Sequence, residues 1–232
     1  MIKNYNDFVE TLLTAGFSFS TSNADGIYAV VPWGWNETPP YDTPVRWHTG
    51  CPETDPWEWR TRVLYERDDI AYGKLFLKRS GFITREWYPY FLAARRGSDT
   101  FQDAYASGTL SHAAKRIYDT ITSNGILPSH DLKRLGGFTK KEKSAFERGL
   151  VELQMKMFIT VCGAQQKISQ KGDAYGMSSS MFCTTEKFWG RDVFDQAEEM
   201  SVDEAYDAVR EQVLKLNPLA EEKKIVKFIL GK

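Results

Sequence analysis

One order of segments, between residues 109 and 189, restricts the fold of this chain more than any other feature of its sequence. The first segment, 109–125, places apolar residues on one helical stripe that ends at Gly125, so we expect an amphipathic helix there. A short helix is predicted to follow over 129–137, with Ser129 as its N-cap and two glycines as its stop.

The second half of this order begins with a third helix and then turns into strands. Thr139 and Glu142 have the spacing of a capping box, in which each side chain satisfies the backbone N–H of the other residue. Residues 157–163 and 177–189 read as strands on either side of a polar loop. Three helices, a strand, a loop and a strand are typical of a winged helix, a relative of the helix-turn-helix. We therefore expect an α+β fold, mainly α, with one winged helix near 109–189.

The residues before this segment are predicted to form an N-terminal α/β portion. Helical spacing of apolar residues predicts a helix over 5–15, and β-like residues follow over 17–31. A connection rich in Pro, Gly and Trp occupies 32–54, and connections of this length are usually functional or strained. Residues 73–84 fit a strand or a helix equally well, and 85–96 is helical in places.

The residues after the predicted winged helix form a helical C-terminal portion. An acidic stretch precedes a predicted helix over 202–216, and a second helix is expected after Pro218 with no strands behind it. This ending reads as a partial second winged helix. We expect three units: 1–108 with a candidate active-site segment, 109–190 as the winged-helix domain, and 191–232.

Composition and charge exclude several classes of protein. The 232 residues carry a net charge of −1 and a sequence pI of about 6.3, so any nucleic-acid surface must be local. Cys51, Cys162 and Cys183 are odd in number and widely spaced, which argues against a disulfide framework and indicates a reducing cytoplasm. With three histidines and no CxxC spacing, we expect no metal and no cofactor. No signal peptide and no membrane span are predicted.

A basic surface is nevertheless predicted within the winged-helix segment. Residues 109–175 contain eleven Lys and Arg against six Asp and Glu. These cations crowd the second helix, the start of the third and the loop, where a winged helix meets phosphates. An ordinary solvated face is the alternative, and winged helices also bind proteins. The residues expected to contact DNA are Lys133, Arg134, Lys140, Lys141, Lys143, Lys167 and Lys171.

The stretch GCPETDPWEWR places two carboxylates directly before a predicted helix. Asp55 as N-cap, Pro56 at the first helical position and Glu58 two residues later make a strong start signal, and the helix should run to about Glu66. Because Glu53 and Asp55 precede the helix, an extended chain would point both side chains to one face. The pair is therefore either a cap beside a solvated acid or two carboxylates placed for chemistry.

Three further stretches carry a resemblance to a known family. The first, 69–96, contributes Tyr72, Trp87, Tyr88, Pro89, Phe91, Arg95 and Arg96. Together with 125–163 and 203–231, it resembles the AlkZ/YcaQ-like winged-helix DNA glycosylases in the order of its blocks. The second block resembles a winged helix of that family, and the third looks like the first two helices of its next one. The resemblance covers roughly residues 50–231 and implies a shortened relative without the family's β-barrel region.

The resemblance also implies a chemistry for the acid pair. In that family a Gln-x-Asp or Gln-x-Gln motif precedes a Pro and a helix and carries the glycosidic-bond chemistry. Its match here is Glu53-Thr54-Asp55 before Pro56, with a carboxylate at Glu53 in place of the amide. The implied activity is excision of alkylated or crosslinked bases from double-stranded DNA. A carboxylate would activate the water and offset the positive charge that develops on the sugar.

Five neighbouring residues are candidates to support this site. His48, Trp57 and Trp59 are candidates for a base pocket, although a satisfied histidine and core tryptophans are the alternatives. Arg60 and Arg62 lie on the predicted helix and are candidates for phosphate contact, with ion-paired surface residues as the alternative.

Three functions remain open at this level: a DNA glycosylase-like enzyme, a non-catalytic winged-helix DNA binder or regulator, and an offshoot with another ligand or partner protein. The first requires the acid pair in a positively rimmed pocket, whereas the second predicts Asp55 as a simple cap. The oligomeric state is left open.

Overall fold

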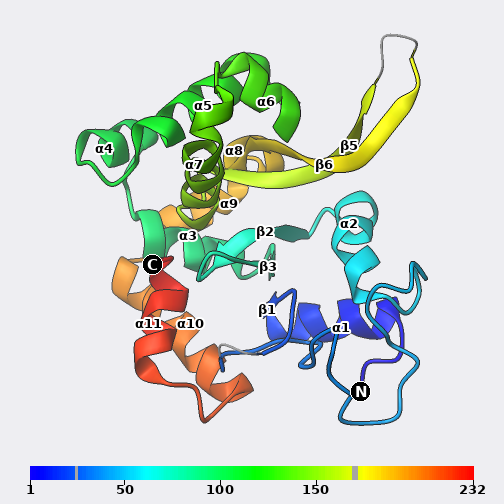
Figure 1. Ribbon diagram of the computed structural model, residues 1–232. Coiled ribbons are helices and arrows are strands. Elements are labelled where there is room, and N and C mark those ends of the chain that lie inside the picture. The colour runs from blue at the N-terminus through cyan, green and yellow to red at the C-terminus, as the bar shows by residue number, and fades with distance from the viewer. Residues whose placement is uncertain (24–25, 169–171) are drawn as a thin grey trace.

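One antiparallel sheet of six strands runs through the protein and connects its N-terminal part to its middle part (Figure 1). The computed structural model describes residues 1–23, 26–168 and 172–232. The strand order is β1-β3-β2-β5-β6-β4. The strands are β1 Phe17–Phe19, β2 Ile70–Phe76, β3 Arg79–Thr84, β4 Leu127–Pro128, β5 Ile159–Ile168 and β6 Ala174–Thr184.

Helices surround this sheet, and about half of the chain is helical, so the fold is of mixed α/β type. No helix among the described residues has the length and apolar character that crossing a membrane requires. The helices are α1 Tyr5–Ala15, α2 Pro56–Glu66, α3 Tyr88–Arg96, α4 Phe101–Ala106, α5 His112–Asn124, α6 Ser129–Leu135, the 3-10 turn η1 Lys140–Glu142, α7 Lys143–Met155, α8 Thr185–Trp189, α9 Asp192–Glu198, α10 Val202–Leu216 and α11 Glu222–Leu230.

The order of elements predicted between 109 and 189 is present as α5, β4, α6, α7, β5 and β6. The capping box of Thr139 and Glu142 is confirmed, and it opens η1, which leads directly into α7. The prediction that Ser129 caps α6 is wrong, because Ser129 already lies in the first turn of the helix. The N-cap is Pro128, whose side chain has no polar atom that could accept a hydrogen bond from the helix N–H groups.

The predicted polar loop and the second predicted strand are both wrong in their extent. Most of the polar segment after residue 163 belongs to the long β5–β6 hairpin, which projects from the body in Figure 1. Cross-strand backbone pairing such as Gln165 with Ser179 gives these polar residues their strand geometry. The second strand ends at Thr184 rather than 189, because its side chain caps α8 by accepting the Lys187 N–H.

In the N-terminal part, α1 is confirmed, whereas the β-like segment 17–31 yields only the short strand β1. The undecided segment 73–84 is part of the β2–β3 hairpin. Its turn residues, Leu77 and Lys78, have φ of 49° and 64°, the left-handed geometry of a two-residue hairpin turn. Such turns normally signal themselves by Asn or Gly, so this hairpin was not recognisable from the sequence.

The three units predicted from the sequence remain a prediction, but their elements share one sheet and packed cores. Tyr72 of β2 pairs with Val161 of β5, which carries the sheet across the predicted boundary at 108. One buried cluster includes residues of β1, β2 and α3 together with residues of α9, α10 and α11. A second lies beneath α5 and α7, and a third joins α1, α2 and part of the loop 32–54.

A half-buried arginine, Arg95, links three elements that are distant in the chain. The Arg95 guanidinium donates to the carbonyl oxygens of Leu75 at 2.9 Å, Met155 at 3.0 Å, and Phe228 and Ile229 at 2.8 Å each. Burial lowers the pKa of Arg95 to about 9, so the group is still charged at neutral pH. The carbonyls at the C-terminal ends of α7 and α11 carry partial negative charge, which stabilises this cation.

We expect Arg95→Met to lower the free energy of unfolding by about 3 kcal/mol or more, because it leaves several buried carbonyls without a donor. Equilibrium urea unfolding measures the loss. Arg191→Met is the matched control, because Arg191 forms only exposed ion pairs, with Asp195 and Glu198, and each such pair contributes about 1 kcal/mol or less. Equal losses in the two variants would contradict the linking role of Arg95.

Candidate nucleic-acid interface

A groove lies between α7 and the β2–β3 hairpin and continues to the loop 32–54. It consists of three adjoining pockets of about 470, 430 and 430 Å³, which we call the cationic, central and aromatic pockets. The cationic and central pockets share Lys74 and Glu147, and the central and aromatic pockets share Arg60 and Ser80. These shared residues make the three pockets parts of one groove.

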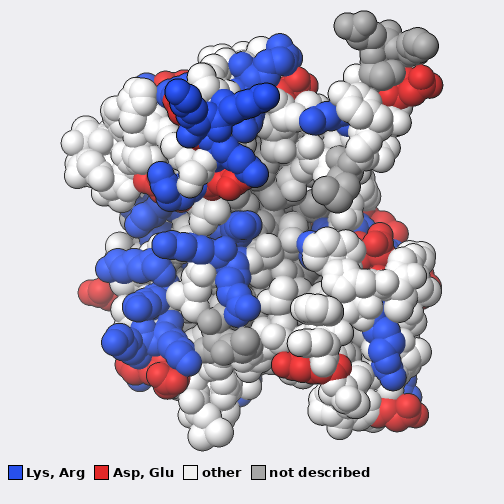
Figure 2. All heavy atoms as spheres, in the orientation of Figure 1, with Lys and Arg blue, Asp and Glu red and all other residues white. Residues whose placement is uncertain are grey.

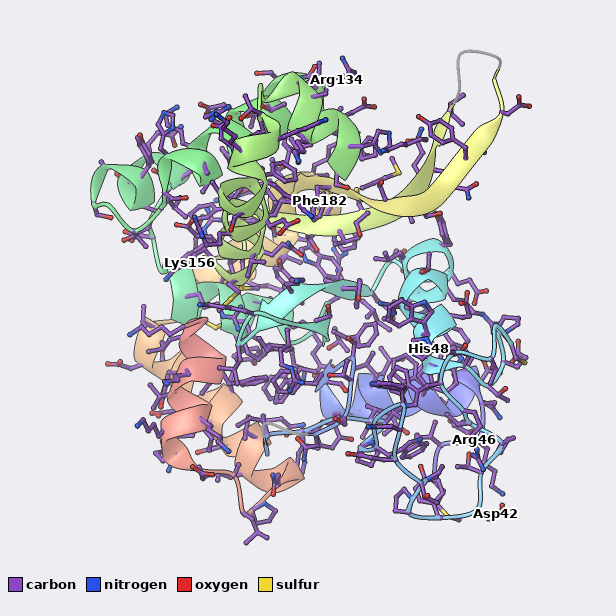
Figure 3. All side chains as sticks on the ribbon, in the orientation of Figure 1. Asp42, Arg46, His48, Arg134, Lys156 and Phe182 are labelled. Carbon is purple, nitrogen blue, oxygen red and sulfur yellow. The ribbon has the colours of Figure 1, made fainter. Side chains whose placement is uncertain are left out.

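Figure 3 labels one lining residue of each pocket. Lys156 marks the cationic pocket at the end of α7, Phe182 of β6 marks the central pocket, and His48 of the loop marks the aromatic pocket. The three lie from left to right across the molecule in this view. The groove therefore runs from the C-terminal helices towards α2.

The cationic pocket is lined by more positive than negative side chains. Glu152, one of its acids, has both carboxylate oxygens engaged by Ser111, which donates its N–H and its hydroxyl at 2.7 Å each. Burial, followed by the charges of Arg95 and Lys232, lowers the pKa of Lys156. Figure 2 shows Lys and Arg gathered over this half of the face, whereas the half with α2 is mostly uncharged. The basic residues that line the pocket are Lys74, Lys78, Arg148, Lys156 and Lys232.

Three of the cations predicted to contact DNA lie together at the start of α7. Lys140, Lys141 and Lys143 are exposed on η1 and the first turn of α7. Lys143 lies 3.8 Å from a carboxylate oxygen of Glu147. In the ranges that the structure describes, no carboxylate lies within ion-pair distance of Lys140 or Lys141. This cluster is therefore available to an external anion.

The other predicted cations are dispersed. Lys133 and Arg134 lie in the last turn of α6, where Arg134 bonds Asp131 at 2.9 Å and is labelled at the top of Figure 3. Lys167 is exposed on β5, in the part of the hairpin that projects from the body. Lys171 lies outside the described residues.

Asp55 is the N-cap of α2, as the sequence predicts, and its carboxylate also accepts hydrogen bonds from the preceding loop. Its Oδ1 accepts the N–H of Trp57 at 2.8 Å and of His48 at 3.0 Å, and its Oδ2 accepts the N–H of Gly50 at 2.8 Å. The residue is 0% exposed. Both carboxylate oxygens are thus used to hold the loop 46–51 against the start of α2.

Glu53 points in another direction. Its carboxylate receives the Arg62 guanidinium at 2.7 Å, and Arg62 also bonds Glu66 at 2.8 Å. Arg62 stacks over the Tyr5 ring at 4.0 Å as well. Glu53, Asp55 and Arg62 line none of the three pockets, so the structure does not bring the acid pair together at the groove.

The remaining predicted residues divide between core and groove. Trp59 is fully buried, stacks on Phe8 and donates its indole N–H to the Pro52 carbonyl at 3.1 Å. His48 and Trp57 line the aromatic pocket. Arg60 lies where the central and aromatic pockets meet, with its guanidinium 3.3 Å from the centre of the Trp57 ring.

Several groove residues were missed in the sequence. Trp35 and Trp47 join the aromatic pocket, and the five tryptophans between 33 and 59 were a signal for them. Lys74 and Lys78 were missed because their segment had no assigned structure. Across the described ranges, no three His, Cys, Asp or Glu side chains gather closely enough to hold a metal ion.

We expect Asp55→Ala to destabilise the protein by about 2 kcal/mol, since it removes a helix cap and two further hydrogen bonds from loop N–H groups. Glu53→Ala is the control, because it removes only an exposed ion pair and should cost less than about 1 kcal/mol. Urea unfolding followed by tryptophan fluorescence measures both losses. Similar stability of the two variants would show that the loop does not depend on Asp55.

Comparisons with known proteins give one family and one related structure. The sequence model of a family described as AlkZ related matches residues 2–230. Among solved structures, the DNA glycosylase AlkZ of Streptomyces sahachiroi is similar at 15% sequence identity and a TM-score of 0.40, covering 77% of this chain and 51% of that one. The chain thus spans about half the length of that glycosylase. Comparison with curated protein sequences gives no significant match.

The family match extends beyond the resemblance seen in the sequence. That resemblance began near residue 50, whereas the match begins at residue 2 and therefore includes α1, β1 and the loop that supplies the aromatic pocket. It confirms the family that the order of blocks indicated. The chain belongs to the AlkZ-related family.

Proposed function

We propose that the protein is a DNA-binding winged-helix protein with a glycosylase-like role in DNA repair. Duplex DNA lies over η1 and the start of α7, and its backbone continues along the cationic pocket. The observation that carries the proposal is the continuity of charge from Lys140, Lys141 and Lys143 to the Lys74 and Lys78 side of the groove. A row of cations of this kind fits the regularly spaced phosphates of a duplex.

The order of elements supports the winged-helix part of this proposal. Three helices precede a hairpin, and the short strand β4 between the first two helices pairs with β6. In this topology α7 occupies the place of the recognition helix, and the β5–β6 hairpin occupies that of the wing. A cytoplasmic location suits the three cysteines, Cys51, Cys162 and Cys183, all of which are free thiols.

Removing the three exposed lysines of η1 and α7 should weaken duplex binding about tenfold or more. The triple variant Lys140→Ala, Lys141→Ala, Lys143→Ala should also reduce the dependence of affinity on salt, by about one unit of slope for each phosphate that the variant no longer binds. Fluorescence anisotropy with a labelled duplex, measured over a range of salt concentrations, gives both quantities.

The control for this experiment removes the same charge elsewhere. Lys3→Ala, Lys215→Ala, Lys223→Ala changes three exposed lysines that line none of the groove pockets. This variant should retain nearly all of the wild-type affinity. Equal weakening in the two triple variants would mean that binding follows net charge alone, and the absence of binding by the wild type would end the proposal.

Hydrolysis of the N-glycosidic bond of alkylated or crosslinked bases is a second candidate function, and one feature of the site favours it. The segment 48–57, which contains the match to the family's catalytic motif, holds both Asp55 and two aromatic residues of the groove. In this version Asp55 fixes His48 and Trp57 where a damaged nucleotide would lie, and its carboxylate adds negative potential behind them.

Release of bases from N-alkylated duplex DNA tests this second candidate. Asp55→Asn should abolish release, because its amide places an N–H donor against the loop N–H groups and removes the charge. Glu53→Gln should keep or raise it, because the change restores the family's residue and Glu53 points away from the groove. Normal release by both variants would falsify a role for the pair, and no release by the wild type would leave a non-catalytic DNA binder.

A further inference from the structure

The aromatic pocket is the part of the groove that binding of the DNA backbone leaves unexplained. Its lining includes the rings of Trp35, Trp47, His48 and Trp57, together with small polar residues and two arginines, Arg60 and Arg79. Arg60 also lines the central pocket. Its volume of about 430 Å³ lies within the range of small-molecule sites, about 300–1,000 Å³. It is therefore large enough to enclose a flat organic ring system.

Two of these rings are unusually exposed. Trp35 is 73% and Trp57 is 45% exposed, although large apolar side chains of this kind normally contribute to a core. The His48 ring lies between them, with its centroid 4.8 Å from that of Trp57 and 6.4 Å from that of Trp35. Trp47 is fixed in place, because its indole N–H donates to the Trp33 carbonyl at 3.1 Å.

The backbone at His48 is held in a conformation that a histidine seldom adopts. Its φ is 60°, in the left-handed region, and the bonds from Asp55 to the N–H groups of His48 and Gly50 fix the loop there. Strain of this kind persists only where the surroundings impose it, and it concentrates at binding sites. The strained turn directs the His48 ring into the pocket.

The walls suit a planar heteroaromatic ring better than a compact ammonium group. Aromatic rings also bind ammonium groups, but the Arg60 guanidinium already covers the Trp57 ring at 3.3 Å and would repel a second cation there. Polar groups at the edge, including the hydroxyl of Ser80 and the carboxylate of Glu37, can bond the edge of a heterocycle. A heteroaromatic ring would thus stack on the aromatic side chains and form hydrogen bonds at its edge.

The position of the pocket adds the second half of the ligand. Arg60 and Ser80 belong both to this pocket and to the central pocket, which leads to Lys74 and the cationic end. A ligand that occupies the whole groove therefore carries a flat ring at one end and negative charge along the rest. A nucleotide displaced from a DNA duplex has this composition.

We infer that the aromatic pocket receives a single unpaired nucleobase, which stacks against Trp35 and Trp57 while the adjoining phosphates lie along the groove. The inference rests on the proposed DNA binding and names the part of the DNA that this site reads. The protein then distinguishes a duplex with an extrudable base from a fully paired one, whether or not it cleaves the glycosidic bond.

The test compares two duplexes of one sequence. One carries 2-aminopurine paired with thymine, and the other carries it opposite an abasic site, where it has no partner. Anisotropy gives the affinity for each duplex, and 2-aminopurine emission reports whether the base stacks on protein rings. The wild type should bind the unpaired duplex about tenfold or more tightly than the paired one, as expected for stacking on aromatic side chains.

Variants of the rings separate this site from the backbone contacts. Trp35→Ala and Trp57→Ala should abolish the preference and the change in emission. Trp35→Ala should keep the wild-type affinity for the paired duplex, whereas Trp57→Ala also removes the ring on which Arg60 lies. Trp35→Phe is the matched control, because it keeps an aromatic face and should retain most of the preference. The lysine variant of η1 and α7 should instead weaken both duplexes equally.

The outcomes distinguish failure of the pocket from failure of DNA binding. If the wild type binds both duplexes equally, or if both alanine variants keep the preference, the base pocket is wrong and the proposed DNA binding stands. If neither duplex binds, both are wrong. Urea unfolding of each variant confirms that the absence of a preference does not come from unfolding.

Discussion

The arrangement of the groove depends on one half-buried cation, Arg95. Arg95 joins carbonyls that lie 20, 60 and more than 130 residues away in the chain, and these belong to β2, α7 and α11. No carboxylate supplies the counter-charge in this contact; the ends of two helices do so through their dipoles. The contact fixes the end of α7 against the end of β2, and the cationic pocket lies at this junction, with Met155 and Gly231 among its lining residues. Arg95 thereby holds the elements that form this end of the groove, and its charge adds to burial, the larger cause, in lowering the pKa of Lys156 at the edge.

A second charge, on the buried Asp55, organises the other end. The sequence left two interpretations of this residue open, a helix cap or a catalyst. The structure uses both oxygens for backbone N–H groups, so Asp55 acts on the groove through the residues it positions, His48 and Trp57. Glu53, its expected partner, is engaged by Arg62 instead. Two carboxylates that are two residues apart in sequence thus have unrelated environments, because the chain turns over residues 52–54 instead of running extended. Glu53 lies within this turn, and Asp55 follows it at the start of α2.

Local signals were the part of this fold that the sequence could predict. Helices α1, α2 and α10 depend on signals within one or two turns, and the bounds of all three were predicted closely, as was the cap of α2. The β2–β3 hairpin was not predicted because its turn has no glycine or asparagine. The length of the β5–β6 hairpin was not predicted because backbone pairing between the strands forms despite the polar side chains. The aromatic pocket could not be predicted either, since only the folded loop brings Trp35 beside Trp57. Counting cations also misled at Arg116, which bonds Glu142 and the carbonyls of the glycine turn after α6.

The way α7 is packed decides how DNA can approach. The buried amide of Gln154 accepts the Lys74 N–H at 2.9 Å and donates to the Leu150 carbonyl at 2.8 Å, so the C-terminal half of α7 is fixed against β2. Only η1 and the N-terminal half of the helix are free to enter a major groove.

A duplex seated there would have the β2–β3 hairpin alongside it, where Lys74 and Lys78 face the same pocket as Arg148 of α7. In the proposed complex, α7 and the β2–β3 hairpin would therefore act as one surface. A nucleotide displaced from the duplex on this surface would follow the groove past Arg60 to the tryptophans, which connects the binding of the backbone and the binding of the base within a single path.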